Sequence, residues 1–129
     1  MLESIANQPN LAAARVWLDA TAMRQQALAA NLANASTPGY KRVDLNSDFE
    51  ANFRRELQSG QLGNGQNFPL SVETDTSARA VGPDGNNVAI EEEMQAINEN
   101  ALRYQFMTQY VSTSLKHLET AITGRVQPS

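Results

Sequence analysis

The sequence predicts a mainly α fold, in which long N- and C-terminal helices pair antiparallel as a coiled-coil-like hairpin. Near both ends of the 129-residue chain, apolar residues recur at alternating spacings of three and four, the pattern of one helix face. The stretch between them lacks this period and is rich in glycine, asparagine and glutamine. We therefore expect one structural domain with three parts: residues 1–42, 43–87 and 88–129.

The N-terminal helix is expected from about Pro9 to Asn34. Proline suits the first turn of a helix, where its missing N–H costs little. One face carries the predicted seam, which comprises Leu11, Ala14, Leu18, Thr21, Gln25, Leu28, Leu32 and Ala35. Alanines on the other faces would let more than one neighbour approach closely, so we expect this helix to have several packing partners.

A sharp stop follows this helix in the sequence NLANASTPGYKR, residues 31–42. The α conformation is disfavoured at Thr37 because proline follows, and Pro38 and Gly39 fit the centre of a type II turn. Tyr40 then lies at the exit, followed by a basic pair that the negative end of the helix dipole favours. Two interpretations stay open: a simple helix stop with a solvated basic pair, or a rigid elbow with the tyrosine anchored on a neighbouring protein.

The middle region, residues 43–87, is expected to be irregular. The sequence SGQLGNGQNFP carries three glycines and indicates a loop. The sequence ARAVGPDGNNVAI predicts two short strands around Pro-Asp-Gly, which would form a small β-hairpin. Phe49 and Phe53, with Leu45 and Leu57, indicate a short amphipathic helix or turn.

The C-terminal helix is expected from about Ile90 to Thr123, with a seam sustained over about four heptads. The seam residues are Met94, Ile97, Ala101, Tyr104, Thr108, Val111, Leu115, Leu118 and Ile122. Glutamates 91–93 lie in the first turn, where negative charge favours the helix dipole. Gly124 fits the position after the last turn, and Pro128 bars continuation. Two such helices alone form few apolar layers, so we expect other chains as partners.

The charge and residue inventory disfavours most other function classes. The net charge is −4 and the Lys and Arg residues are scattered, so no basic stripe for a nucleic acid is present. There is no cysteine, and the single histidine, His117, is expected on the surface of the second helix rather than in a catalytic site. Adjacent glutamates point around a helix and cannot converge on a metal. We therefore predict a protein that is not an enzyme and uses no cofactor or metal.

The sequence also bears on export and membranes. The N-terminus lacks a basic start and an apolar run, so no cleaved secretory signal peptide is expected. No stretch approaches the ~18 consecutive apolar residues that a transmembrane helix needs.

Two stretches resemble a known family. NLANASTPGYKR resembles the N-terminal signature of the flagellar axial proteins, which form the rod, hook and hook-associated parts of the bacterial flagellum. Its Thr-Pro-Gly-Tyr-Lys form, in a chain this short, is most similar to the proximal rod members. DGNNVAIEEEMQAINENALRYQ, residues 84–105, and LKHLETAITGR resemble the C-terminal part of the same family. The chain departs from the family at Ser36, where an aspartate is usual.

This resemblance implies a structural role in a helical tube. The rod connects the membrane ring to the distal rod and hook and transmits torque across the periplasm. Its subunits pass through the flagellar type III export apparatus without a cleaved signal peptide. The implied partners are copies of the chain, other rod proteins, and the adaptor and membrane-ring proteins at the rod base.

The expected interface and packing residues are the apolar seam positions of both helices, together with Asn31, Asn34 and the turn from Thr37 to Tyr40. Three alternatives stay open: a soluble helical-hairpin adaptor, a secretion chaperone, or another rod or hook member of the axial family. The two heptad seams could also simply form the core of one hairpin without a partner.

Overall fold

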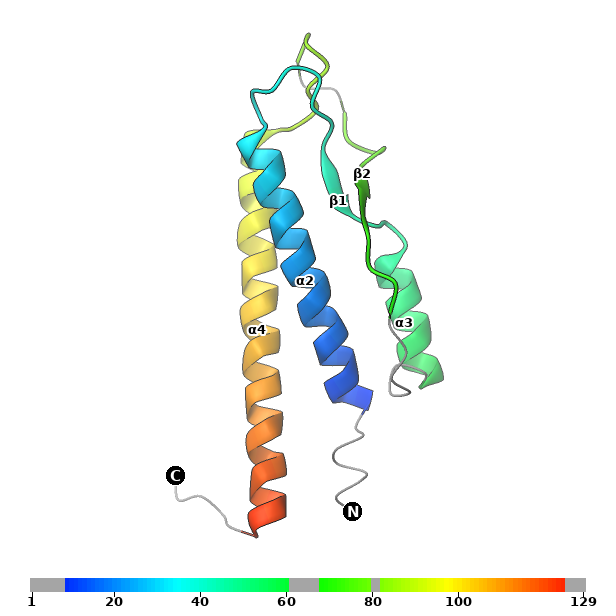
Figure 1. The fold of residues 1–129 in the computed structure, drawn as a ribbon, viewed down its shortest axis with the longest axis vertical. Coiled ribbons are helices and arrows are strands. Elements are labelled where there is room, and N and C mark those ends of the chain that lie inside the picture. The colour runs from blue at the N-terminus through cyan, green and yellow to red at the C-terminus, as the bar shows by residue number, and fades with distance from the viewer. Residues whose placement is uncertain (1–8, 61–67, 80–81, 125–129) are drawn as a thin grey trace.

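The computed structural model describes residues 9–60, 68–79 and 82–124. Their elements are, in order, α2 (Pro9–Ala33), β1 (Val43–Leu45), α3 (Phe49–Ser59), β2 (Val72–Thr74) and α4 (Ile90–Thr123). Helices α2 and α4 run antiparallel side by side, and the short elements pack along one side of α2 (Figure 1). The expected fold class, mainly helical with paired terminal helices, is confirmed.

The helix ends lie close to their expected positions. Helix α2 ends at Ala33 and α4 ends at Thr123, where Gly124 adopts the left-handed conformation with φ 68°. Gly39 has φ 75°, and the Tyr40 N–H donates to the Thr37 carbonyl at 3.2 Å. This geometry matches the predicted type II turn. The expected loop at 61–67 and Pro128 lie outside the described residues.

The middle region contains the expected small antiparallel sheet, but from different segments. Strand β1 pairs with β2 in the register Val43↔Thr74, Asp44↔Glu73 and Leu45↔Val72. The prediction of strands around Pro-Asp-Gly was wrong in its described part, since residues 82–89 form a turn and an extended segment. The reason is that the side chains of Asn86 and Asn87 bond to the segment that follows α2, so this stretch packs against the turn instead of pairing as a strand.

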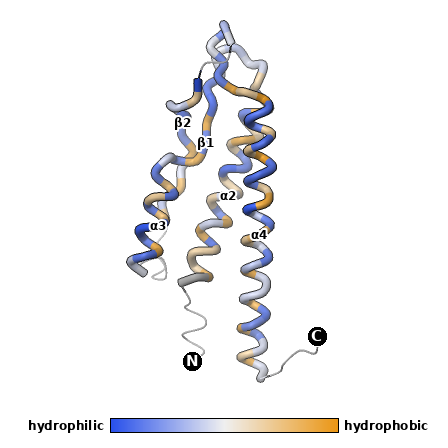
Figure 2. The backbone as a smooth tube through the Cα atoms, turned by 180° about the vertical axis from the view of Figure 1, so that it is seen from behind, coloured by the Kyte–Doolittle hydropathy of each residue, from blue (hydrophilic) through white to orange (hydrophobic). Residues whose placement is uncertain are grey.

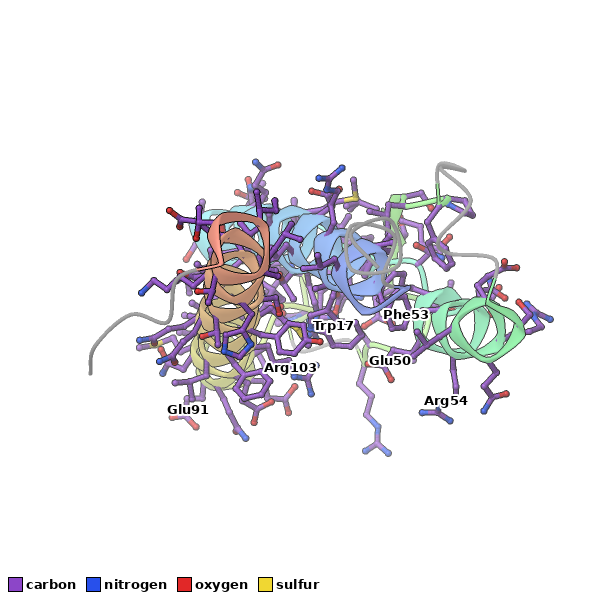
Figure 3. All side chains as sticks on the ribbon, turned by 90° about the horizontal axis from the view of Figure 1, so that it is seen from below. Trp17, Glu50, Phe53, Arg54, Glu91 and Arg103 are labelled. Atoms are coloured by element: carbon purple, nitrogen blue, oxygen red, sulfur yellow. The ribbon has the colours of Figure 1, made fainter. Side chains whose placement is uncertain are left out.

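Helix α3 is the short amphipathic helix that the aromatic spacing predicts. Its Phe49 and Phe53 contact Trp17 of α2, with ring centroids 5.8 and 5.3 Å apart, and Phe68 packs edge-on against both phenylalanines. Leu45 belongs to β1 instead. Because large aromatic rings bridge the gap, α3 stands at some distance from α2 and is held mainly by this cluster (Figure 3).

The core between the helices is thin and made largely of small side chains. The buried apolar residues of the described chain are Ala13, Ala14, Ala20, Ala27, Leu28, Phe49 and Val88. Most of the larger apolar residues of α4 are exposed instead, and they recur along its length (Figure 2). The structure therefore leaves much apolar surface on the outside of α4.

The two long helices differ in length. Helix α4 has 34 residues and α2 has 25, and their ends at the elbow are nearly level (Figure 1). The last nine residues of α4, Leu115–Thr123, consequently extend past the described end of α2. We call this segment the overhang.

Candidate functional site: the polar elbow and the exposed faces of α4

Asn31, in the last turn of α2, joins four parts of the chain. Its side chain is fully buried, and its Nδ2 donates to the Val43 carbonyl at 2.7 Å and to Glu93 Oε2 at 3.3 Å. Its Oδ1 accepts from the Val43 N–H at 2.9 Å and from the Tyr40 hydroxyl at 3.1 Å. One amide thus ties α2, the turn, β1 and α4 together, which fixes the direction in which the chain leaves the helix.

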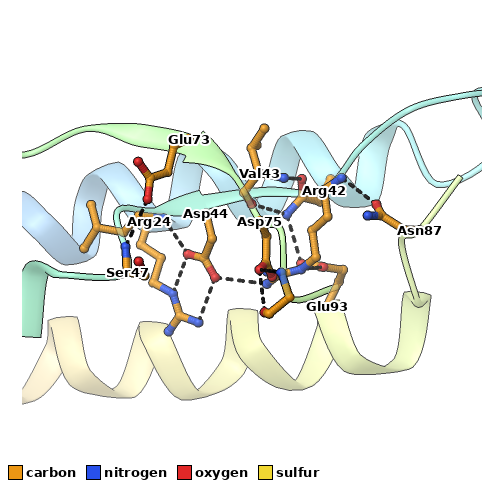
Figure 4. A network of polar contacts seen from close by, with 12 residues as sticks. Arg24, Arg42, Val43, Asp44, Ser47, Glu73, Asp75, Asn87 and Glu93 are labelled. Carbon is orange, nitrogen blue, oxygen red and sulfur yellow. Dashed lines mark hydrogen bonds and ion pairs between the residues drawn. The ribbon is translucent and has the colours of Figure 1, made fainter. Parts of the chain in front are cut away.

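Arg42 lies at the centre of an ion-pair network beside this amide (Figure 4). Its guanidinium pairs with Glu93 of α4, with Asp75 at 2.6 Å and with Asp44 at 3.1 Å. The Glu93 side chain is only 1% exposed. A carboxylate buried this deeply needs a charged partner and hydrogen bonds, and Arg42 and Asn31 supply them.

Asp44 connects the network to α2. Arg24 donates to both of its carboxylate oxygens, at 2.9 and 3.2 Å, a bidentate geometry that favours a strong pair. Burial by itself would raise the pKa of Asp44. The hydrogen bond and charge of Arg24, the Leu45 N–H and the charge of Arg42 outweigh burial, so the pKa lies below the ordinary value. The carboxylate therefore stays charged and keeps β1 against α2.

Asp75 and the Tyr40 hydroxyl, which lie beside the same network, also have shifted pKa values. Hydrogen bonds from Ser77, against an opposing effect of burial, and the pairing with Arg42 lower the pKa of Asp75. Burial, followed by the negative charge of Glu93, raises the pKa of the Tyr40 hydroxyl. The hydroxyl consequently stays neutral and available as the donor to Asn31.

The segment before α4 bonds to the turn that follows α2. Asn86 Nδ2 donates to the carbonyls of Asn34 and Thr37 at 2.9 and 2.8 Å, in addition to the backbone N–H groups that these carbonyls already accept. Asn87 Oδ1 accepts from the Arg42 N–H at 2.6 Å. The stretches NLANASTPGYKR and DGNN, far apart in the sequence, therefore fold as one unit, which we call the elbow.

Several predictions about charged residues at the elbow were incomplete. Arg42 was assigned to the helix dipole, but it pairs with carboxylates, whereas Lys41 is exposed and donates to a loop carbonyl. Glu91 and Glu92 are exposed in the first turn of α4 as expected, but Glu93 is buried. Glu93 and Asn100, the two buried polar residues of α4, are seven residues apart. This spacing was the signal in the sequence that could have predicted their burial, but a search for apolar seams does not detect it because both residues are polar.

The predicted seam of α4 is rotated from the face that packs on α2. The fully buried residues of α4 are Glu93 and Asn100, whose amide donates to the Thr21 carbonyl and to Gln25 Oε1. The predicted interface residues divide as follows: Leu28 and Asn31 are buried; Leu11, Leu18, Leu32, Asn34, Tyr40, Ile97, Val111 and Leu118 are half-buried; Thr37, Pro38, Gly39, Met94, Ala101, Tyr104, Leu115 and Ile122 are exposed. His117 is exposed as expected.

Five of the exposed apolar residues of α4 lie along one side of the helix. These residues, which we call the seam flank, are Ile90, Met94, Tyr104, Leu115 and Ile122, and their spacing keeps them on one side of the helix. Beside Tyr104, an apolar groove of about 370 Å³ opens between α4 and the Ala22–Gln26 part of α2. Surfaces of this kind on a small chain mark sites of association.

The described part of the chain contains neither a membrane-spanning helix nor a cluster of side chains that could bind a metal ion. None of its helices is long and apolar enough to cross a membrane. Within the same residues, no group of three or more acidic, histidine or cysteine side chains could hold a metal ion. The notable features of the surface are therefore the elbow and the apolar faces.

Comparison with known proteins agrees with the N-terminal motif and with the resemblance to the family. The profile of the family described as "Flagella basal body rod protein" matches residues 18–41, which span the second half of α2 and the turn. The chain is 30% identical to the flagellar basal body rod protein FlgB of Escherichia coli (strain K12), with 77% of this chain and 82% of that protein covered. It is 32% identical to FlgB of Aquifex aeolicus (strain VF5), covering 86% and 90%, and 29% identical to FlgB of Salmonella typhimurium, covering 83% and 88%.

Proposed function

The chain belongs to the FlgB family of flagellar basal body rod proteins, and we propose that it joins its neighbours in the rod through the exposed faces of its terminal helices. It is a structural subunit of the rod and not an enzyme. The observation that carries the proposal is the seam flank of α4, an apolar stripe whose side chains are 45–62% exposed. Burying such a stripe against other subunits is a favourable source of binding energy.

The elbow supports this proposal by fixing the geometry of the subunit. A helical assembly repeats one contact many times, so a small change in the angle between elements would accumulate along it. Asn31, Arg42 and Glu93 lock the helix pair and the sheet together, and the exposed Pro38-Gly39 turn projects from the end of the pair. We infer that this turn, with the part of Tyr40 left exposed, contacts a neighbouring subunit.

We base the proposed place of the chain within the flagellum on its family. We infer that it lies in the proximal part of the rod, in the periplasm, between the membrane ring and the distal rod and hook, and that it transmits torque. Its proposed partners are copies of itself, other rod proteins, the adaptor and membrane-ring proteins at the rod base, and the flagellar type III export apparatus. The names of the relatives, which are basal body rod proteins, support this placement.

The test is an image reconstruction of basal bodies purified from cells that carry this chain, at a resolution that shows side chains. We expect two long paired helices in the proximal rod, with the seam flank buried against a neighbouring subunit. Absence of the chain from the rod, together with a stable soluble dimer in the same cells, would favour an adaptor or chaperone instead.

A further inference from the structure

A second groove lies on the other side of the helix pair from the seam flank, between α3 and α4. Helix α2 forms its floor with Ala13 and Trp17, and its lower walls are Phe53 and Leu57 of α3 and Phe106 and Tyr110 of α4. This lower part is apolar and has a volume of about 360 Å³. Figure 3 shows Trp17 and Phe53 on the same open side of the molecule. We call the whole feature the α3–α4 groove.

The upper part of the groove, of about 320 Å³, also borders Trp17 but has more polar lining residues than the lower part. Glu50 of α3 and Glu99 and Arg103 of α4 line it, and none of the three has an ion-pair partner in the described part of the chain. Asn100 also lines it, and its buried Oδ1 is without a hydrogen-bond partner there. The exposed charges of Glu50, Glu99 and Arg103 make the upper groove suited to a partner with complementary charges.

The overhang of α4 has matching properties. Leu115 and Ile122 are 52% and 62% exposed, and the segment lacks the helix that covers the rest of α4 within the described residues. Lys116 and Glu119 are exposed, and neither forms an ion pair among those residues. Nine helical residues span about 13 Å, and the groove runs for about 17 Å along α2 from Ala13 to Arg24.

One parallel register satisfies these groups together. If the overhang lies beside α4 of another copy with a shift of about 16 residues, Lys116 falls opposite Glu99 and Asn100, and Glu119 falls opposite Arg103. The same shift places Ile122 opposite Phe106 in the apolar part of the groove. In this register Lys116 faces the carboxylate of Glu99, Glu119 faces the guanidinium of Arg103, and Ile122 faces the apolar part of the groove.

We propose that the α3–α4 groove receives the overhang, Leu115–Thr123, from a second copy of the chain, in parallel orientation. The proposal rests on the proposed function, because a rod needs contacts between subunits that point the same way. The two surfaces are different parts of the chain, so the contact is heterologous and does not close on itself. Each copy would be displaced from the next by about 24 Å along the helix direction.

Disulfide cross-linking tests the contact directly, since the chain has no cysteine of its own. The double variant Phe106→Cys/Ile122→Cys, expressed as the only copy and recovered in purified basal bodies, should form a ladder of linked copies under mild oxidation with copper phenanthroline. The matched control is Leu102→Cys/Ile122→Cys, because Leu102 and Phe106 are both 66% exposed but only Phe106 lines the groove. The control should give no ladder.

A charge reversal gives an independent measurement with variants that should fold. Arg103→Glu and Glu119→Arg should each lower incorporation into basal bodies about tenfold, and the double variant should restore it. Three outcomes would overturn the groove proposal and leave the proposed function standing. In the cross-linking test, these are incorporation of the cysteine variant without a ladder and a link to a different protein. In the charge reversal, it is a double variant that does not restore incorporation. Absence of the unmodified chain from basal bodies would instead overturn the proposed function.

Discussion

At the scale of single residues, the elbow depends on a few buried polar groups. Arg42 faces three carboxylates, and the most buried of them, Glu93, reaches it from the far helix. A buried charge costs free energy unless it is paired, so the network fixes the arrangement of its members more than it adds stability. Removing one member should therefore lower the free energy of unfolding, because the remaining buried groups would lose the partner with which they pair.

Glu93→Ala tests this view of the network. We expect a loss of about 3 kcal/mol in the free energy of unfolding, because Asn31 and Arg42 would lose their shared acceptor inside the fold. Urea unfolding followed by circular dichroism measures it. Glu92→Ala is the matched control, since Glu92 is the adjacent exposed glutamate and should change stability by no more than about 0.5 kcal/mol. If Glu93→Ala and Glu92→Ala lowered the free energy of unfolding equally, the buried network would contribute no more to stability than an exposed glutamate does.

At the scale of elements, the sequence predicted the two long helices well and the sheet poorly. Alternating spacings of three and four extend over many turns, so Pro9–Ala33 and Ile90–Thr123 were recognisable locally. Strands β1 and β2 have three residues each and lie on either side of α3, so neither their alternation nor their pairing is visible in a short window. Their position depends on Arg42 and Asp75, a contact between distant segments.

The rotation of the α4 seam has a similar cause. A periodicity search follows apolar residues, and in this helix the apolar line is largely the exposed seam flank. The buried line instead includes Glu93 and Asn100, which are polar because they bond to groups of α2 and the elbow. The pattern thus predicted the existence of a helix face that needs partners, but not which face packs within the chain.

The aromatic cluster makes α3 a separable element. Phe53→Ala should weaken the attachment of α3 by about 1.4 kcal/mol, because one of the rings that bridge to Trp17 is lost. We expect amide hydrogen exchange within Phe49–Ser59 to become about tenfold faster, with exchange in α2 and α4 unchanged. Leu57→Ala is the control, because Leu57 lies on α3 outside the ring cluster and is already partly exposed. Uniform acceleration across all helices would show that α3 is an integral part of the core.

At the scale of the whole molecule, the side chains that hold the fold together differ from those that are available for assembly. Alanines and amides fill the space between α2 and α4, while large apolar residues lie outside on α4. A chain that keeps its larger hydrophobic groups exposed gains less from folding alone and more from association. This distribution is what a subunit of a continuous structure requires, and it explains why the helix pair looks thin by itself.

Two substitutions to aspartate separate these roles. Leu28 is fully buried, so Leu28→Asp should destabilise the helix pair by several kcal/mol, a large part of the stability of a small domain. Leu115 is 52% exposed, so Leu115→Asp should leave the helix content and urea midpoint of the free chain nearly unchanged. The second variant should nevertheless abolish rod assembly, because a charge would lie where the overhang and the seam flank meet other subunits. Circular dichroism of the free chains and electron microscopy of basal bodies distinguish the two defects. Normal motility with Leu115→Asp would mean that this end of α4 faces solvent in the rod, and the assembly surface would then have to lie closer to the elbow.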